Sequence, residues 1–257
     1  MKVTVLTENT ACRDDVTAQH GLSLFIETGE RKILFDMGQD DTFLRNAEAM
    51  GIDLSQVDIA FVSHGHYDHG GGLETFLRVN TKAPVYLHEK AFGDYYNGTQ
   101  KYIGLDKTLQ GHLRLMDTSG SCTVDEGLTL TDCNHFDWNC NPWGLNCREE
   151  DAFLPDSFYH EQYLEITEGS KRVLISGCSH KGIANIARHF HPDVLIGGFH
   201  LNKMEDPEEV KAVAAKLLLG DTVYYTGHCT GQAQFALLKE IMGPRLQSLS
   251  TGFVFEV

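Results

Sequence analysis

Short apolar segments rich in β-branched residues recur along the chain, and most of them are followed by Gly, Asp or His. Segments of this length and composition are typical of buried or half-buried β-strands. We therefore expect strands at residues 2–7, 22–28, 32–38, 58–64, 83–89, 128–132, 162–167, 172–178, 193–200 and 221–228.

Helical patterns alternate with several of these strands. The clearest covers residues 206–220, where Asp206 suits the N-cap, Pro207 fits the first helical position and Gly220 is placed to end the helix. The early strands lie close together and helix-linked strands follow, so we predict an α/β fold in which residues 1–257 form a single sandwich of two sheets flanked by helices. Weaker helices are expected at 41–50, 70–79, 180–190 and 232–242.

One segment, residues 133–161, shows no convincing periodic pattern, and it contains both tryptophans, Trp138 and Trp143. A long segment of this kind in a compact domain is usually a functional lid or a disordered insertion. Two tryptophans argue against simple disorder. We expect a lid or insertion whose tryptophans either stack against a flat substrate or hold the loop against the core.

Charge and composition restrict the class of partner. The chain of 257 residues has 21 Lys and Arg against 36 Asp and Glu, a net charge of −15. This charge repels a nucleic-acid backbone or an anionic membrane surface, although a bound metal could reverse the sign locally. No apolar run approaches the roughly 20 residues of a membrane span, and the N-terminus does not resemble a signal peptide. We expect a cytoplasmic protein with reduced thiols and a small-molecule substrate, without nucleic-acid or membrane partners.

Polar residues follow the expected strands at a common position. Four strands run into a histidine, and a fifth ends in an aspartate. In open α/β sheets, ligands bind in the crevice beyond the carboxyl ends of the strands. We therefore expect convergence of the side chains of His64, His180, His200, His228 and Asp36.

The segment HGHYDH, residues 64–69, has the densest chemistry. On an extended chain His64 and His66 project from one face and can bind one ion together. The chain then turns into a helix, so Asp68 and His69 can face a second, nearby ion. Imidazole nitrogens with a carboxylate oxygen suit zinc, iron, manganese or nickel better than calcium or magnesium. We expect two divalent ions, with zinc preferred.

The same segment matches the H-x-H-x-D-H signature of the metallo-β-lactamase superfamily, and it stands between an apolar strand and a Gly-rich helix start. The segments SGCSHKGIANI (176–186), IGGFHL (196–201) and TGHCTG (226–231) resemble a narrower branch, the dihydropterin ribofuranosyl-aminobenzene phosphate synthase-like proteins. The resemblance implies a four-layer αβ/βα sandwich of two mixed sheets with a dinuclear metal site at one edge.

The resemblance also implies roles for single residues. Asp36 resembles an aspartate that orients a ligand histidine from behind. His200 matches no shared ligand position, so we expect it to contact the substrate or to orient a ligand. The positions that match metal ligands are His64, His66, Asp68, His69 and His228.

The chain departs from the superfamily pattern at one place. Where many members have Gly-Asp, with an aspartate that bridges two metals, this chain has Gly177 and Cys178. We interpret His180, two residues later, as filling a ligand histidine position that is otherwise missing, and His135 is the competing candidate. Cys178 is either a thiolate ligand or a small packing residue.

These features give three functional hypotheses. Two ions about 3.5–4 Å apart can activate a shared water and polarise a carbonyl or phosphoryl oxygen. The first hypothesis is therefore a metal-dependent hydrolase of an ester, lactone or phosphoester, with metal-bound hydroxide as the nucleophile and with Asp68 and His200 in catalytic or substrate-binding roles. The branch resemblance favours a synthase or transferase for a pterin-like or ribosyl-phosphate substrate. The third is a non-enzymatic metal-binding or redox module. The substrate is expected to be anionic or heterocyclic.

Overall fold

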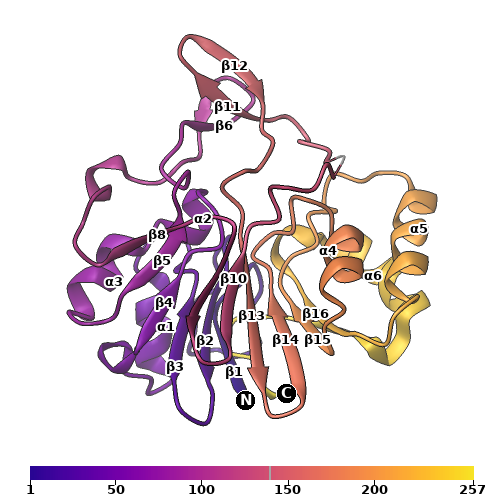
Figure 1. Ribbon diagram of the computed structural model, residues 1–257. Coiled ribbons are helices and arrows are strands. Elements are labelled where there is room, and N and C mark those ends of the chain that lie inside the picture. Colours follow the sequence, from indigo (N-terminus) through magenta and orange to yellow (C-terminus); the bar gives the residue numbers. More distant parts are fainter. Residues whose placement is uncertain (139) are drawn as a thin grey trace.

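The computed structural model describes residues 1–138 and 140–257. Two seven-stranded sheets pack face to face, and helices cover the outer face of each sheet (Figure 1). Each sheet combines antiparallel and parallel pairs. The expected α/β sandwich of two mixed sheets is therefore confirmed.

The first sheet is formed by the N-terminal half of the chain and the last strand, in the order β18-β1-β2-β3-β4-β5-β8. The helices on its outer face are α1 (Thr42–Ala49) and α3 (Leu73–Val79). The short helix α2 (Tyr67–Gly70) lies at the edge of the sheet, where His69 contacts Asp36 and Met37 after the end of β3. The strands are β18 (Val254–Glu256), β1 (Lys2–Thr7), β2 (Ser23–Glu27), β3 (Lys32–Phe35), β4 (Ile59–Phe61), β5 (Val85–His88) and β8 (Leu115–Thr118).

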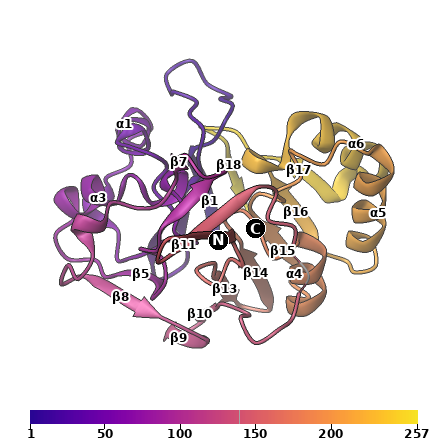
Figure 2. The same ribbon diagram turned by 90° about the horizontal axis from the view of Figure 1, so that it is seen from above.

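The second sheet has the order β17-β16-β15-β14-β13-β10-β9. The helices on its outer face are α4 (Ile183–Phe190), α5 (Pro207–Leu217) and α6 (Gln232–Met242), seen from above in Figure 2. The strands are β17 (Leu246–Ser248), β16 (Val223–Thr226), β15 (Val194–Ile196), β14 (Lys171–Ile175), β13 (Tyr163–Glu168), β10 (Leu128–Thr131) and β9 (Ser121–Asp125).

Alternation along the strands divides the apolar residues among the layers. On β14, Val173 and Ile175 face the core between the two sheets, whereas Leu174 packs under the helices of the second sheet. Both faces of the strand are therefore buried, which explains why it reads as a continuous apolar run. The interface between the sheets fixes their edges relative to each other, and the polar strand ends lie along one such edge.

A third, four-stranded sheet projects beyond the sandwich (Figure 1). It joins β6 (Tyr95–Asn97) and β7 (Lys101–Tyr102) to β11 (Leu145–Glu149) and β12 (Ala152–Pro155), in the order β12-β11-β6-β7. The segment 133–161, which shows no local periodicity, thus contains a β-hairpin. Its pairing partner β6 is remote in sequence, which is why the local pattern does not reveal it. Asn139 of this segment lies outside the described residues.

In place of the single helix expected at 70–79, the structure has two short helices, α2 and α3. Tyr67 opens α2, so Asp68 and His69 lie inside a helical turn, and α3 follows separately. The two glycines between them permit close packing, because a Cβ on Gly71 would stand 2.3 Å from the carbonyl oxygen of Gln39. Short 3₁₀ turns complete the fold at η1 (Leu54–Gln56), η2 (Lys107–Leu109), η3 (His228–Thr230) and η4 (Gly243–Arg245). In the described part of the chain no helix has the length and apolarity to cross a membrane.

Candidate metal centre

The strand ends converge as the sequence predicts. β3 and β4 are parallel neighbours in one sheet, and β14, β15 and β16 are parallel neighbours in the other, so their carboxyl ends meet at one edge of the sandwich. Backbone conformation marks the same edge. Asp36, Ser179, His200 and His228 have φ values of 58°, 59°, 51° and 49°. Non-glycine residues adopt this left-handed region at a cost, and such strain collects at functional sites.

His64 and His180 face each other across the gap between the two sheets. Their Nε2 atoms are 3.3 Å apart, and both rings are buried. The Ser63 hydroxyl donates its hydrogen bond to Asp36 at 2.8 Å. Its oxygen therefore accepts a hydrogen bond from Nδ1 of His64, also at 2.8 Å. This places the proton of His64 on Nδ1 and leaves a lone pair on Nε2, directed at His180.

His69 and His228 form a second pair of the same kind. Their Nε2 atoms are 3.2 Å apart. Nδ1 of His69 donates to Asp36 at 2.6 Å, and Nδ1 of His228 donates to the side-chain oxygen of Asn9 at 3.0 Å. Both Nε2 atoms therefore present lone pairs to the same space. Asp36 bonds His69 directly and contacts His64 through Ser63.

His66 and Asp68 complete the two sides. His66 is 4% exposed, its Nε2 atom has no hydrogen-bond partner among the described residues, and its ring centroid lies 5.1 Å from that of His180. A carboxylate oxygen of Asp68 lies 3.4 Å from Nε2 of His228 and 3.0 Å from Nε2 of His20. We assign these side chains to two candidate ligand sets: His64, His66 and His180, and Asp68, His69 and His228. The ligand atom of His66 also lies close to those of Asp156 and His160, and that of Asp68 to those of His20 and His228.

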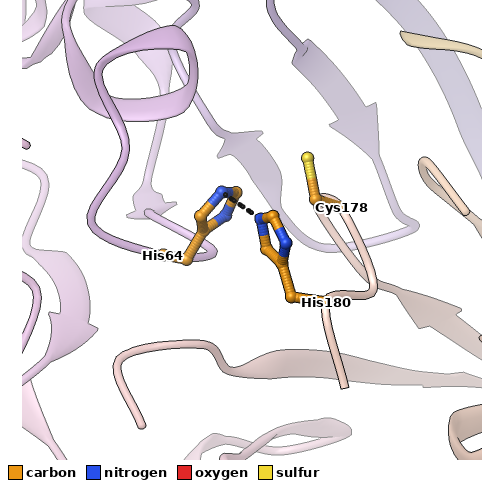
Figure 3. A group of neighbouring side chains, drawn as sticks. All are labelled: His64, Cys178 and His180. Atoms are coloured by element: carbon orange, nitrogen blue, oxygen red, sulfur yellow. Dashed lines mark hydrogen bonds between the residues drawn. The ribbon is translucent and has the colours of Figure 1, made fainter. Parts of the chain in front are cut away.

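Cys178 stands between these two sets. Its sulfur and the ligand atoms of His64 and His180 lie within 4.8 Å of one another, and the same holds for Cys178 with His69 and His228. Figure 3 shows the thiol beside the facing imidazoles of His64 and His180. Cys178 and His180 leave the end of β14 two residues apart and project to the same side.

Burial sets the protonation of the imidazoles. It lowers the pKa of His66 to about 3, with a further contribution from the nearby His160. Burial, reinforced by neighbouring histidines, also lowers the pKa values of His64 and His180 well below the usual range. For His69, burial lowers the pKa, but the charge and hydrogen bond of Asp36 outweigh it and raise the net value. At neutral pH His64, His66 and His180 are therefore uncharged, the form that binds metals.

The clustered side chains are of the kinds that bind transition metals. The lone pairs of His69 and His228 face each other at 3.2 Å and repel each other. Nε2 of His66 and Nδ1 of His180 lack hydrogen-bond partners among the described residues, which is rare for buried polar atoms. Ligand atoms at 2.0–2.1 Å from a tetrahedral zinc are about 3.3 Å apart, which is the spacing found here. Nitrogen ligands with one carboxylate suit zinc, iron, manganese or nickel. Each set would thus supply three protein ligands to one ion.

Two buried residues at the site were not identified from the sequence. His160 is 1% exposed; its Nδ1 accepts from the amide of Gly65 at 2.9 Å, and its Nε2 bonds Asp156 at 3.0 Å. Glu161 accepts from the amides of His180 and Lys181 at 2.8 and 3.1 Å and so fixes the loop after β14. Neither follows a strand end, so the pattern that locates the other residues misses them.

The remaining predicted residues divide between the site and its surroundings. The His200 ring lies 4.2 Å from that of His180, and both of its nitrogens are without partners among the described residues. His135 is exposed and packs on Phe136, away from the cluster. Trp138 stacks on Phe136 at 5.0 Å. The backbone oxygen of Trp143 accepts from Lys203 at 2.6 Å.

A cavity of about 130 Å³ opens onto the metal-facing side chains. The exposed residues of its lining, which define its mouth, are His20, Asn97, Lys101, Asn202 and Lys203. The buried and half-buried residues of its lining are His66, Tyr67, Asp68, Ile103, Leu145, Cys178, His180, His200, His228 and Cys229. Neither tryptophan is among the described residues that line it. A larger cavity of about 670 Å³ lies between α4 and the end of α5, but it touches none of the clustered histidines, so we place the chemistry at the smaller one.

Comparisons with known proteins agree with this geometry. Residues 16–136 match the family model of the metallo-beta-lactamase superfamily. Over the full chain, a solved structure described as a metal-dependent hydrolase of the beta-lactamase superfamily is 27% identical, with a TM-score of 0.81 and coverage of 100% of this chain and 99% of that one.

Two curated relatives come from Methanocaldococcus jannaschii. One is an uncharacterized protein, 28% identical, with 93% of this chain and 94% of the relative covered. The other is 7,8-dihydropterin-6-methyl-4-(beta-D-ribofuranosyl)-aminobenzene-5'-phosphate synthase, also 28% identical, with 83% and 82% covered.

Proposed function

Because the chain carries a metallo-β-lactamase superfamily domain, we propose that it is a metal-dependent hydrolase that cleaves a small anionic ester, lactone or phosphoester. The family resemblance of the HGHYDH segment and of the later segments is confirmed by the comparisons. The observation that carries the proposal is the two pairs of facing imidazoles, His64 with His180 and His69 with His228, whose Nε2 atoms converge beside one cavity.

Two divalent ions, zinc first, would supply an activated water and would polarise the carbonyl or phosphoryl oxygen of a bound substrate. The protein's own groups hold the ligands in fixed tautomers. Asp36, Ser63 and Asn9 accept hydrogen bonds from the Nδ1 atoms of His69, His64 and His228, respectively. These bonds keep the Nε2 atoms of the three rings directed at the proposed ions. His200 lines the same cavity with both nitrogens unpartnered and is placed to bond a polar group of the substrate.

The mouth of the cavity favours an anionic substrate. In a chain of net charge −15, Lys101 from β7 and Lys203 from the loop after β15 both line this opening. Asn97 and Asn202 line it as well and add hydrogen-bonding groups. A volume of about 130 Å³ is well below the roughly 300–1,000 Å³ of sites that enclose drug-sized ligands. The cavity thus suits the reacting end of a substrate, with a carboxylate or phosphate at the lysines.

The test is a panel of chromogenic phosphomonoesters, phosphodiesters, lactones and thioesters, with protein loaded separately with zinc, manganese, iron or nickel. We expect metal-dependent hydrolysis of at least one class and its loss after chelation. The matched control is His135→Ala, whose histidine lies outside the cluster. A fully metal-loaded protein that hydrolyses no class would contradict the proposal and favour a non-enzymatic metal-binding module.

A second candidate function is favoured by one relative. The name of the 28% identical synthase describes a dihydropterin joined to a ribofuranosyl-aminobenzene phosphate. The lysines at the cavity mouth would suit the phosphate of such a substrate. The heterocycle would need more room than the cavity provides, so the hairpin β11–β12 and the segment before it would have to move. The substrates for the test are a ribofuranosyl-aminobenzene phosphate and a dihydropterin whose 6-methyl carbon carries a phosphate ester as the leaving group, so that the amine nitrogen displaces that ester. Mass spectrometry then separates the two functions: a joined product with released phosphate supports the synthase, and unchanged substrates exclude it.

A further inference from the structure

The thiol of Cys178 lies where both sets of metal-facing side chains can reach it, and we propose that its thiolate is a ligand shared by the two metal ions. Nε2 of His69 is 3.1 Å from the sulfur, and the ligand atoms of His64 and His180 lie within 4.8 Å of it. Figure 3 shows the thiol beside His64 and His180. The proposal rests on the dinuclear site of the proposed function and assigns the ligand that joins its two halves.

The backbone at the end of β14 aims this sulfur into the site. Ser179 takes φ of 59°, and its hydroxyl bonds that of Ser176 at 2.7 Å, which holds the turn between Cys178 and His180. Gly177 permits the close approach of this turn to the first sheet, because a Cβ there would stand 2.2 Å from Oγ of Ser63. The loop is therefore held close to Ser63 and His64 of the first sheet.

The surroundings of Cys178 differ from those of a packing cysteine. Cys133, equally buried, belongs to the apolar core beneath the helices of the second sheet. Cys178 is 3% exposed, yet it belongs to none of the hydrophobic clusters formed by the described residues. Its neighbours include imidazole nitrogens with lone pairs. A small apolar side chain gains nothing from that environment, whereas a thiolate bound to metal does.

A negatively charged shared ligand would reduce the repulsion between the two metal ions. Two divalent ions a few ångströms apart repel each other, and an anionic atom between them offsets that repulsion. Asp68 is the one carboxylate in the proposed ligand sets, and it lies on the side of His69 and His228. A sulfur in the shared position also favours zinc and cobalt over manganese or magnesium, because soft ligands prefer the softer ions.

Cys229 is the competing thiol and provides a matched variant. Its sulfur, that of Cys178 and a nitrogen of His200 lie within 4.8 Å of one another. The Cys229 thiol donates to the backbone oxygen of Cys178 at 3.6 Å and packs against Gly198, where a Cβ would stand 2.4 Å from it. Cys229 is not part of the two groups in which Cys178 lies close to a facing pair, His64 with His180 and His69 with His228. Cys12, an exposed thiol, controls for adventitious binding.

The experiment is titration of the metal-free, reduced protein with cobalt(II), read by absorption. We expect two equivalents to bind and to produce an intense sulfur-to-cobalt charge-transfer band in the near ultraviolet. The band should persist in Cys229→Ser and Cys12→Ser and disappear in Cys178→Ser. Because the thiolate is shared, both binding steps should weaken by at least about tenfold in Cys178→Ser. In Cys178→Asp, which retains an anionic ligand, we expect the band to disappear while the ratio of manganese to cobalt affinity rises.

Each contrary result is distinct. A band that survives in both Cys178 variants, or is lost in Cys229→Ser, overturns the assignment. Weakening of one step alone would make Cys178 the ligand of a single ion and overturn the shared role. Two bound cobalt ions without a charge-transfer band overturn the thiolate and leave the dinuclear site intact, whereas a wild-type chain that binds no cobalt contradicts the proposed function itself. If Cys178→Ser fails to fold, the band in Cys178→Asp decides the identity of the ligand.

Discussion

The Nε2 atoms of His69 and His228 lie 3.2 Å apart inside the protein, although each ring has its proton fixed on the opposite nitrogen. Asp36 accepts from one Nδ1 atom and Asn9 from the other. Two lone pairs are thereby held face to face, an arrangement that a cation stabilises and that an empty apolar interior does not. The other facing pair, His64 and His180, lies beside His69 and His228, and Cys178 lies between the two pairs. These relationships give the following predictions.

His180, and not His135, is expected to be essential for metal binding. His180 is buried in a loop that Glu161 fixes through two amide hydrogen bonds, whereas His135 is exposed. A tight metal site needs ligands on rigid elements. His180→Ala should lose bound metal and most activity, and His135→Ala should keep its metal. Elemental analysis of both variants side by side is the measurement, and metal loss confined to the His135 variant would reverse the assignment.

Asp36 should control metal affinity without touching an ion. It accepts from Nδ1 of His69 and from the amide and hydroxyl of Ser63. An amide in its place can satisfy only some of these donors, so Asp36→Asn should reduce metal affinity by about 10–100-fold. Asp58→Asn is the matched control, since Asp58 accepts one backbone amide, that of Lys32, at the surface. Competition with a calibrated chelator measures both, and equal affinities would show that Asp36 does not orient the ligand.

The metal-free protein should become less stable as pH falls below neutrality. The pKa of His66 is about 3 in the folded chain, against 6.5 for an ordinary histidine. Below about pH 6.5 the unfolded state binds a proton that the folded state does not, so this histidine lowers stability progressively as pH falls from 6.5 toward 3. His64 and His180 act in the same direction. Each contributes a slope of up to about 1.4 kcal/mol per pH unit.

Urea unfolding of the chelated protein between pH 7.5 and 5 measures this slope. His66→Gln removes one of the titrating groups and should flatten the dependence relative to the wild type. A variant whose stability falls as steeply as that of the wild type would show that His66 is already protonated, or solvated, in the folded chain.

The two lysines at the cavity mouth should affect substrate binding more than chemistry. Lys101 and Lys203 line the opening and lie outside the ligand sets. Lys203→Met and Lys101→Met should each raise KM for an anionic substrate by about two- to fivefold, the size expected of exposed charge pairs, with little change in kcat. Lys211→Met on α5, which removes an exposed lysine paired with Glu208, is the control. A fall in kcat at constant KM would place the lysines in the chemistry instead.

The sequence is sufficient for the parts of this site that depend on local pattern. A buried parallel strand can be predicted from its continuous apolar segment, and the polar residue that follows lies at the carboxyl end of the strand. Asp36, His64 and His180 are located in this way, and the structure brings them together. The expected helices were also located, because amphipathic spacing and N-caps are local features; Asp206, for example, caps α5 by accepting from the amide of Glu208.

Other parts depend on partners that are remote in sequence. The hairpin β11–β12 forms against β6, about fifty residues earlier in the chain. His160 and Glu161 enter the site from a loop without a regular pattern, so their burial could not be predicted. Asn9 lies on another loop, next to β1, and meets His228 only because the two sheets close on each other. The tautomer of each ligand histidine depends on such contacts and has no local signature.

The number of transition-metal ions per chain tests the proposed dinuclear centre most directly. The protein is stripped with a chelator, reconstituted separately with zinc, manganese, iron or nickel, freed of excess metal and analysed for its metal content. The two sets of three protein ligands, His64, His66 and His180 and then Asp68, His69 and His228, predict about two ions per chain with at least one of these metals. A value of one or none with every metal, for protein that remains folded, would contradict the account.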